Sequence, residues 1–426
     1  MPMSVSRQSS DTRVPSPWRL KNLLLAPHRL GFFLAMVLLL ASGLWWAAVQ
    51  LDRATGWLGL GYAVPPTLTH AAMMSLGFIP LFFAGFLFTA GPNWLGVAKP
   101  QARHLLFSST LQAAGWLLWL AGAHTRAEVA VIGVAIAAFG LAMQTWRFVG
   151  MLRESSLEDR LHAKVVAMAA GVGVLSVTGV AVSTARGSLD MALVCVLSGL
   201  WGFVVPTYLA VAHRMIPFFT SSAVPMTHAW RPFWVLWAML TAAGLECVVL
   251  WLPVLYGALP REWMLLQGLV ELLAGGVLIW LGVAWGLVQS LKVRLLAMLH
   301  LGFVWLGLSF VLAGASQLLG LQAGVPVLGL GALHALTMGC LGSLLLAMVT
   351  RVACGHSGRP LVADNLMWGL FLALQVAVVL RIAAALPQAP ASFLLLAAWM
   401  WAAVALVWGL RLMGWFGRLR ADGRPG

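Results

Sequence analysis

The sequence predicts an all-α protein, a polytopic bundle of about twelve transmembrane helices, and three observations support this prediction. Hydrophobic residues make up 61% of the 426 residues and charged residues only 9%, whereas soluble domains carry about 25% charged residues. Apolar stretches near the roughly 20 residues that a spanning helix needs recur about twelve times. The connections between them are short, so we expect no inserted soluble domain.

The predicted spans cover residues 30–50, 67–91, 105–123, 127–149, 163–184, 189–212, 232–257, 262–289, 295–319, 325–350, 362–385 and 391–413. They form one transmembrane domain, 30–413, between an N-terminal tail, 1–29, and a C-terminal tail, 414–426. The first tail is polar and has no short apolar core with a cleavage site, so we expect a disordered cytoplasmic segment and not a signal peptide. In the polar connection 151–164, Ser155 and Glu158 match a helix N-cap pair, which predicts a short interfacial helix.

The basic residues predict the orientation of the bundle. The formal net charge is +14, but the basic residues lie between apolar stretches and do not cluster in one domain, which argues against nucleic-acid binding and for contact with membrane lipids. Of the 26 Lys and Arg residues, 21 lie in the segments that share a side with the N-terminus. Each outer segment holds one, namely Arg53, Arg126, Arg186, Arg261 and Arg381. Because cytoplasmic segments are enriched in Lys and Arg, we expect both termini in the cytoplasm and an even number of spans.

Two histidines lie inside predicted spans at a similar depth. At 1.5 Å per helical residue, His70 is about 31 Å and His334 about 25 Å from the cytoplasmic edge, so both belong to the outer half of the membrane. Two neutral imidazoles at one level can ligate a haem iron from both faces. Met74 and Met338 each lie one turn deeper on the same helix face, and the Met338 thioether is a further candidate ligand for haem or copper. The alternative is packing and interhelical hydrogen bonding.

A second candidate metal set lies toward the cytoplasmic side. His213 ends the sixth span, His300 lies near the start of the ninth, and His356 follows the tenth. Three imidazoles from three elements suit copper or zinc, provided that they converge. Arg351 and Arg359 are candidate partners for haem propionates, or else for lipid headgroups. The remaining histidines, in predicted tails and loops, are weaker candidates: His28, His104, His124, His162 and His228.

Two carboxylic acids lie within spans. Glu246 in the seventh span and Glu271 in the eighth fall at similar depth, because the two helices are antiparallel neighbours. In hydrocarbon at least one of them should be protonated. They form either a proton relay from the outer surface toward the outer histidines or a neutral hydrogen bond between helices.

Three runs of residues resemble one family. They are RMIPFFT at 214–220 followed by Ala223 and Pro225, HALT at 334–337 with GHSGRP at 355–360, and GFLFTA at 85–90 followed by Pro92, Asn93 and Trp94. Together they resemble the NnrS family, a bacterial family of membrane proteins with about twelve spans, and the resemblance covers nearly the whole chain.

The resemblance implies a bacterial inner-membrane protein that contains haem, of b type, and copper. It also implies a link to nitric oxide, to nitrosative-stress relief and to denitrification, with nitric oxide or a related small molecule and an electron donor as partners. One departure bears on the copper. The second span of the family opens with His-Ala-His-Glu-Met, and here Ala72 and Met73 stand where the second histidine and the glutamate would be.

We therefore predict a haem protein, with copper as a second candidate metal, that binds or turns over nitric oxide or relieves its toxicity by electron transfer. The rival prediction is a proton-coupled secondary transporter that uses buried His and Glu. Twelve spans suit that class, but the two halves of the chain show no inverted repeat. A third alternative is a regulatory or assembly protein without turnover.

Overall fold

The computed structural model describes residues 16–225 and 228–422, and within them every regular element is a helix and no strand occurs. Within these residues, twelve helical segments are long and apolar enough to cross a membrane. The prediction of an all-α, twelve-span membrane protein is confirmed.

In the described part of the chain, nine spans are single α-helices and three are interrupted by a π-helical segment. The uninterrupted spans are α1 (Pro27–Thr55), α4 (Arg103–Thr125), α5 (Ala127–Glu154), α6 (Leu161–Ala185), α9 (Phe233–Tyr256), α10 (Arg261–Ala284), α12 (Arg294–Leu319), α15 (Asn365–Ala383) and α16 (Ala391–Phe416). The interrupted spans are α2–η2–α3 (Pro66–Ala72, Met73–Gly77, Ile79–Leu95), α7–η3–α8 (Leu189–Gly199, Leu200–Val204, Val205–Ala223) and α13–η4–α14 (Gly331–His334, Ala335–Gly342, Ser343–Ser357). Two short helices, η1 (Leu20–Leu25) and α11 (Leu287–Ser290), lie outside the spans.

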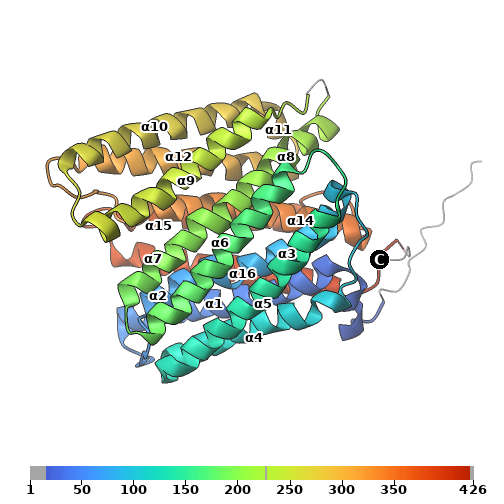
Figure 1. Cartoon of the computed structure of the whole chain (residues 1–426), viewed down its shortest axis with the longest axis horizontal. Coiled ribbons are helices and arrows are strands. Elements are labelled where there is room, and N and C mark those ends of the chain that lie inside the picture. The colour runs from blue at the N-terminus through green and yellow to red at the C-terminus, as the bar shows by residue number, and fades with distance from the viewer. Residues whose placement is uncertain (1–15, 226–227, 423–426) are drawn as a thin grey trace, which may run out of the picture.

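The spans lie side by side in one bundle (Figure 1), in which α1 packs between α16 and α3 while α4 pairs with α5 and α10 with α12. The span α2–η2–α3 is the most buried, followed by α12 and α13–η4–α14. By contrast α9 and α10 are the least buried, which leaves their apolar side chains to lipid. The centre of the bundle therefore contains two of the three spans with a π-helical segment.

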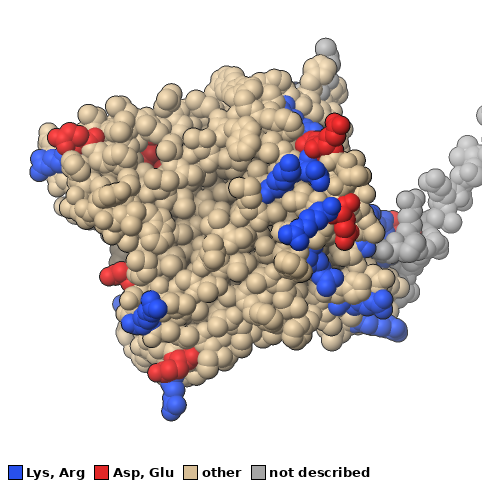
Figure 2. Space-filling view, in the orientation of Figure 1, with Lys and Arg blue, Asp and Glu red and all other residues tan. Residues whose placement is uncertain are grey.

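Both ends of the described chain lie at the same end of the bundle (Figure 1), where the backbone N–H of Arg19 donates a 2.8 Å hydrogen bond to the Gly417 carbonyl. We call this the basic end, because Lys and Arg side chains gather there on the face shown in Figure 2 and only a few lie at the opposite end. This arrangement is what an even number of spans requires. That the basic end faces the cytoplasm stays a prediction from the positive-inside rule.

The expectation of a disordered N-terminal tail is wrong for residues 16–26; residues 1–15 lie outside the described part. Leu20–Leu25 forms η1, with Asn22 and Leu23 buried. The Asn22 side-chain amide donates a 2.8 Å hydrogen bond to the Gly417 carbonyl. This segment is ordered because it packs on the C-terminal end of the chain, a partner that local polarity does not reveal.

The expected interfacial helix in 151–164 is also wrong. Helix α5 continues to Glu154, residues 155–160 are not helical, and α6 begins at Leu161. The Ser155 hydroxyl does not cap a helix; it donates a 2.6 Å hydrogen bond to the Leu95 carbonyl of another span. The Arg160 guanidinium donates to the Ser155 carbonyl at 2.8 Å and closes the loop.

Several span limits differ from the prediction for local reasons. The eighth span ends at Ala284 and not at 289, because Gly286 adopts φ +95°, a left-handed conformation that only glycine takes readily. The tenth begins at Gly331, after a turn, and continues to Ser357, where Gly358 at φ +71° ends it. Hydropathy reports only where a run of apolar residues begins and ends. It therefore does not detect a helix boundary that a glycine conformation or a turn sets.

Candidate functional site

The three π-helical segments surround one cavity. η2 contributes Met74 and Ser75, η3 contributes Leu200, and η4 contributes Met338 among others. π-Helical turns are rare and occur frequently at functional sites, because the extra residue re-aims the side chains of a helix. The convergence of three such turns marks this cavity as the first candidate site.

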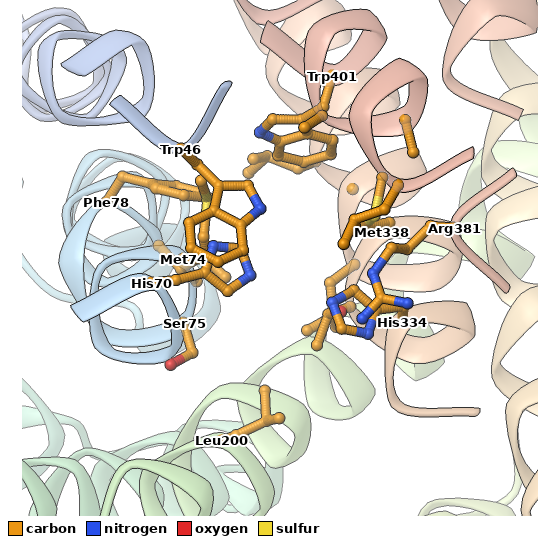
Figure 3. Close-up of a pocket in the computed structure, with 18 of the residues that line it drawn as sticks. Trp46, His70, Met74, Ser75, Phe78, Leu200, His334, Met338, Arg381 and Trp401 are labelled. Atoms are coloured by element: carbon orange, nitrogen blue, oxygen red, sulfur yellow. The ribbon is translucent and has the colours of Figure 1, made fainter. Parts of the chain in front are cut away.

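The structure brings His70 and His334 together across this cavity. His70 lies in the last turn of α2, directly before η2, and His334 is the last residue of α13, directly before η4. Their ring centroids are 6.3 Å apart and the ring planes differ by only 12°. In Figure 3 the two imidazoles lie on opposite sides of an open space.

Both rings are held by neighbours. His334 Nδ1 lies 2.8 Å from the Leu330 carbonyl, which only accepts, so Nδ1 carries the proton and Nε2 keeps its lone pair. Such a bond to the second nitrogen is the usual way in which a ligating histidine is oriented. His70 stacks on Trp46 with centroids 3.8 Å apart (Figure 3). The buried Nδ1 of His70 has no hydrogen-bond partner within the part of the chain described.

The cavity encloses about 700 Å³ of atom-free space, its open mouth included. Its walls are mainly apolar, with the two thioethers of Met74 and Met338 and the guanidinium of Arg381 among the few exceptions. Figure 3 shows Arg381 beside His334 on the same wall. A mainly apolar pocket with a few convergent polar groups is the usual form of a cofactor site.

Arg381 is a site residue that the sequence analysis missed. It served there only as the basic residue of an outer segment, but it lies inside α15 and its side chain reaches the cavity. The sequence feature that could have identified Arg381 is its position at the end of an apolar run, close to the boundary of the hydrocarbon core. The two arginines predicted as anion partners lie elsewhere: Arg351 is 3.9 Å from the Phe219 ring centroid and Arg359 is 4.4 Å from that of Trp415. Neither lines this cavity.

The structure does not bring the second histidine set to one point. Among residues 16–225 and 228–422, no three His, Cys, Asp or Glu side chains gather as metal ligands. His300 instead has its Nε2 2.9 Å from the Thr220 hydroxyl. His213 and His356 each pair with a different histidine. The three predicted ligands are thus divided among three separate contacts.

The partners of His213 and His356 are histidines that the sequence analysis ranked low. His162 Nε2 lies 2.9 Å from His213 Nδ1, and His213 Nε2 lies 3.1 Å from the Pro232 carbonyl. The ring centroids of His28 and His356 are 4.4 Å apart. His28 and His162 were placed in a tail and a loop, because the predicted spans began three and two residues too late. Both lie in the first turn of a span and are buried.

Glu246 and Glu271 line a second cavity of about 670 Å³ and interact directly with each other. The Gln267 amide donates a 2.7 Å hydrogen bond to Glu271 Oε1, while Glu271 Oε2 has no partner among the described residues. Leu333 lines this cavity too, and it precedes His334 in the chain. The acidic pair is therefore separated from the histidine cavity by the wall formed by the tenth span.

Ala72 and Met73 are fully buried. Neither belongs to the lining of the histidine cavity. At the two positions that depart from the family pattern, the side chains thus belong to the apolar core.

A model of the NnrS protein family matches residues 22–420. The chain belongs to the NnrS family. A comparison with curated proteins found no match. Membership indicates a multi-pass membrane protein related to nitric oxide. Of the three runs typical of NnrS proteins, HALT at 334–337 crosses from α13 into η4 at the histidine cavity, and RMIPFFT at 214–220 lies in α8.

Proposed function

We propose that this NnrS protein binds a b-type haem between His70 and His334 and acts on nitric oxide in the bacterial inner membrane, relieving nitrosative stress or serving denitrification. The observation that carries the proposal is the parallel pair of imidazoles, 6.3 Å apart, across a mainly apolar cavity.

The residues present fit a haem better than a bare metal ion. Metal–imidazole bonds are about 2.0–2.1 Å long, so two rings with centroids 6.3 Å apart leave room for one metal ion between them. A haem iron takes four ligands from its macrocycle and needs only one or two from the protein. A pair of histidines with no third His, Cys, Asp or Glu beside it among the described residues is therefore sufficient for haem, whereas zinc and copper sites usually take three or four protein ligands.

Bound haem would supply an iron that accepts or gives single electrons; with both His70 and His334 holding it, nitric oxide would reach the iron only where one histidine dissociates. The protein's part is to hold and shield it. The Leu330 carbonyl fixes the tautomer of His334, and the guanidinium of Arg381, which lines the cavity, would pair with a propionate. The apolar lining keeps water from the site and lowers the local dielectric, which strengthens each of these contacts.

We infer no copper at positions 72 and 73, because an alanine and a buried methionine replace the histidine and glutamate expected there. Cu(I) prefers soft ligands. The thioethers of Met74 and Met338 in the histidine cavity are the remaining candidates for copper.

The test is the optical spectrum and iron content of the purified protein. We expect a Soret band and about one iron per chain, as one histidine pair implies, and we expect His70→Ala and His334→Ala each to lose most of the haem. The matched control is His104→Ala, since His104 is exposed on α4. If His334→Ala kept its full haem content and the wild-type spectrum, the haem would lie elsewhere.

A second candidate function rests on the acidic cavity. Glu246, Gln267 and Glu271 form a polar site inside the bundle, and such groups in spans serve proton relays and transporters. Within the haem proposal they deliver protons toward the histidine cavity; in a transporter they would couple protons to a solute. A colourless purified protein that takes up a solute when a proton gradient is imposed would favour the transporter.

A further inference from the structure

A third cavity opens at the basic end, away from both sites above. It lies between η1, the start of α1, the end of α3, the start of α4 and the end of α14, and contains about 1220 Å³ of atom-free space, its mouth included. Its polar lining includes His28, His356, Lys99 and Arg103, and its apolar lining includes Leu24 and Leu25. No acidic residue is among the described residues that line it.

The histidine pair in this cavity has unused hydrogen-bonding capacity. His28 is only 3% exposed, and its Nδ1 atom finds no partner in the described part of the chain. A buried polar atom without a partner is costly, so this nitrogen favours a ligand that can hydrogen-bond to it. His356 places its ring 4.4 Å from that of His28, measured between centroids.

The surrounding charge selects an anion over a metal ion. Lys99 and Arg103 share the cavity with the two imidazoles, and Arg29 lies close enough to act on His356 as well, whereas the nearby Arg420 is paired with Asp422. A cation bound by only two imidazoles would meet the repulsion of Lys99, Arg103 and Arg29. An anion is attracted by them and by the N-terminus of α1, a helix of 29 residues that begins at Pro27 beside the cavity.

An exposed apolar surface lies at the rim of the cavity, at the basic end of the bundle. Leu20, Leu24 and Leu25 of η1 are exposed, as is Trp18 just before it. An exposed row of leucines with a tryptophan at the end of a transmembrane bundle is typical of a segment at the membrane surface. The anion that suits this site therefore carries an apolar tail.

We propose that this cavity binds the phosphate group of an anionic phospholipid. Lys99 and Arg103 pair with the phosphate, His28 and His356 donate hydrogen bonds to it or to the headgroup, and the acyl chains lie along η1. Basic pockets between helices on the cytoplasmic side of membrane proteins bind such headgroups. This phospholipid site shares no lining residue with the histidine cavity or with the acidic cavity, so the proposal is independent of the haem proposal.

The test compares lipid retained by the full-length protein. Protein is equilibrated with mixed micelles of phosphatidylglycerol and phosphatidylcholine, and bound lipid is measured by native mass spectrometry. We expect wild-type protein to retain phosphatidylglycerol selectively. The double variant Lys99→Gln/Arg103→Gln should retain it about tenfold less, because two cation–phosphate contacts are lost. The control, Arg147→Gln/Arg153→Gln, removes two exposed charges from the last turns of α5, outside the cavity, and should behave as wild type.

Both exchanged residues are exposed, so folding should survive, and an unchanged thermal unfolding midpoint verifies this. Equal retention by the double variant and the control, or equal retention of the two lipids by wild-type protein, overturns the proposal. Excess inorganic phosphate separates the two sources of the anion. Displacement of phosphatidylglycerol only at a large excess supports the lipid, whereas inorganic phosphate that binds the lipid-free protein as tightly as the lipid does overturns it.

Discussion

At the scale of single residues, the backbone and the neighbouring rings determine what each histidine can do. His334 has its proton placed on Nδ1 by the Leu330 carbonyl. In the pair of His162 and His213, the Pro232 carbonyl requires a proton on His213 Nε2, so His213 Nδ1 accepts from His162 Nε2. The first arrangement leaves a nitrogen free toward a cavity. The second uses both nitrogens of His213 for hydrogen bonds, which makes His213 a structural residue.

The charge of Arg381 leads to a residue-scale prediction. Arg381→Gln removes the guanidinium that lines the cavity beside His334. A positive charge near a haem favours the reduced iron, so the midpoint potential should fall by some tens of millivolts, on the scale of a charge interaction at an effective dielectric constant near 20. A potentiometric titration of the Soret band measures it. Arg351→Gln, whose charge lies on the Phe219 ring outside the cavity, is the control and should leave the potential nearly unchanged.

At the scale of elements, the helices approach closely where glycines face one another. A Cβ atom at Gly133 of α5 would lie 2.5 Å from the Trp119 backbone nitrogen and 2.6 Å from the Gly115 carbonyl oxygen of α4. Small residues at such contacts allow backbones in a membrane to pack tightly. The pairing of α4 with α5 thus depends on glycine at this point.

Gly133→Ala should therefore lower the free energy of unfolding by about 1–3 kcal/mol, the usual cost of overpacking. The matched control is Gly150→Ala in the same helix, where a Cβ meets no described atom within 4 Å. Thermal unfolding in detergent compares the two variants. Similar midpoints for both would contradict the close-packing explanation.

The cap of α15 yields a prediction about pH. Asp364 accepts a 3.0 Å hydrogen bond from the Met367 backbone N–H and pairs with both terminal nitrogens of Arg411. The hydrogen bond from Arg411 is the main reason that the pKa of Asp364 lies below its ordinary value. A carboxyl with a lowered folded-state pKa stabilises the fold above the unfolded value, near 3.9, and loses this effect as the pH falls through the folded value.

Asp364→Asn keeps a helix cap and removes the ion pair. At pH 7 it should lower the free energy of unfolding by at most about 1 kcal/mol, because the pair is half-exposed. The difference from wild type should shrink as the pH falls below about 4. Unfolding curves at neutral and acidic pH measure it. Arg411→Gln should cause the same loss, and the double variant should cost no more than either single one; additive losses would argue against a direct interaction.

At the scale of the whole molecule, the two ends of the bundle differ in charge and in content. The basic end holds both described chain ends and the His28–His356 cavity, while His70 and His334 follow the first turns of their spans near the other end. The two sites are joined by neighbouring rings: His28 to Phe32, Phe32 to Phe82, and Phe82 to Phe78, which lines the His70–His334 cavity. The core between the sites is thus a continuous packed unit.

The orientation of this unit can be measured with single cysteines in a background without the four native ones. Arg126 and Arg153 are both exposed and lie at opposite ends of α5. If the basic end faces the cytoplasm, a membrane-impermeant thiol reagent should label Arg126→Cys in intact spheroplasts and Arg153→Cys only after permeabilisation. The reverse pattern would place the basic end outside.

The sequence by itself determined the fold class and the number of spans, and it placed His70 and His334 at one level. These properties follow from hydropathy and from a fixed rise per residue, which are local. The folded bundle decided which side chains meet: Arg381 at the histidine cavity, His28 beside His356, and His162 beside His213. Each of these contacts joins segments far apart in the chain, and π-helical turns such as η4 shift the faces that a regular helix would present. Lateral packing and such shifts leave no periodic trace in the sequence, so only the tertiary structure could show them.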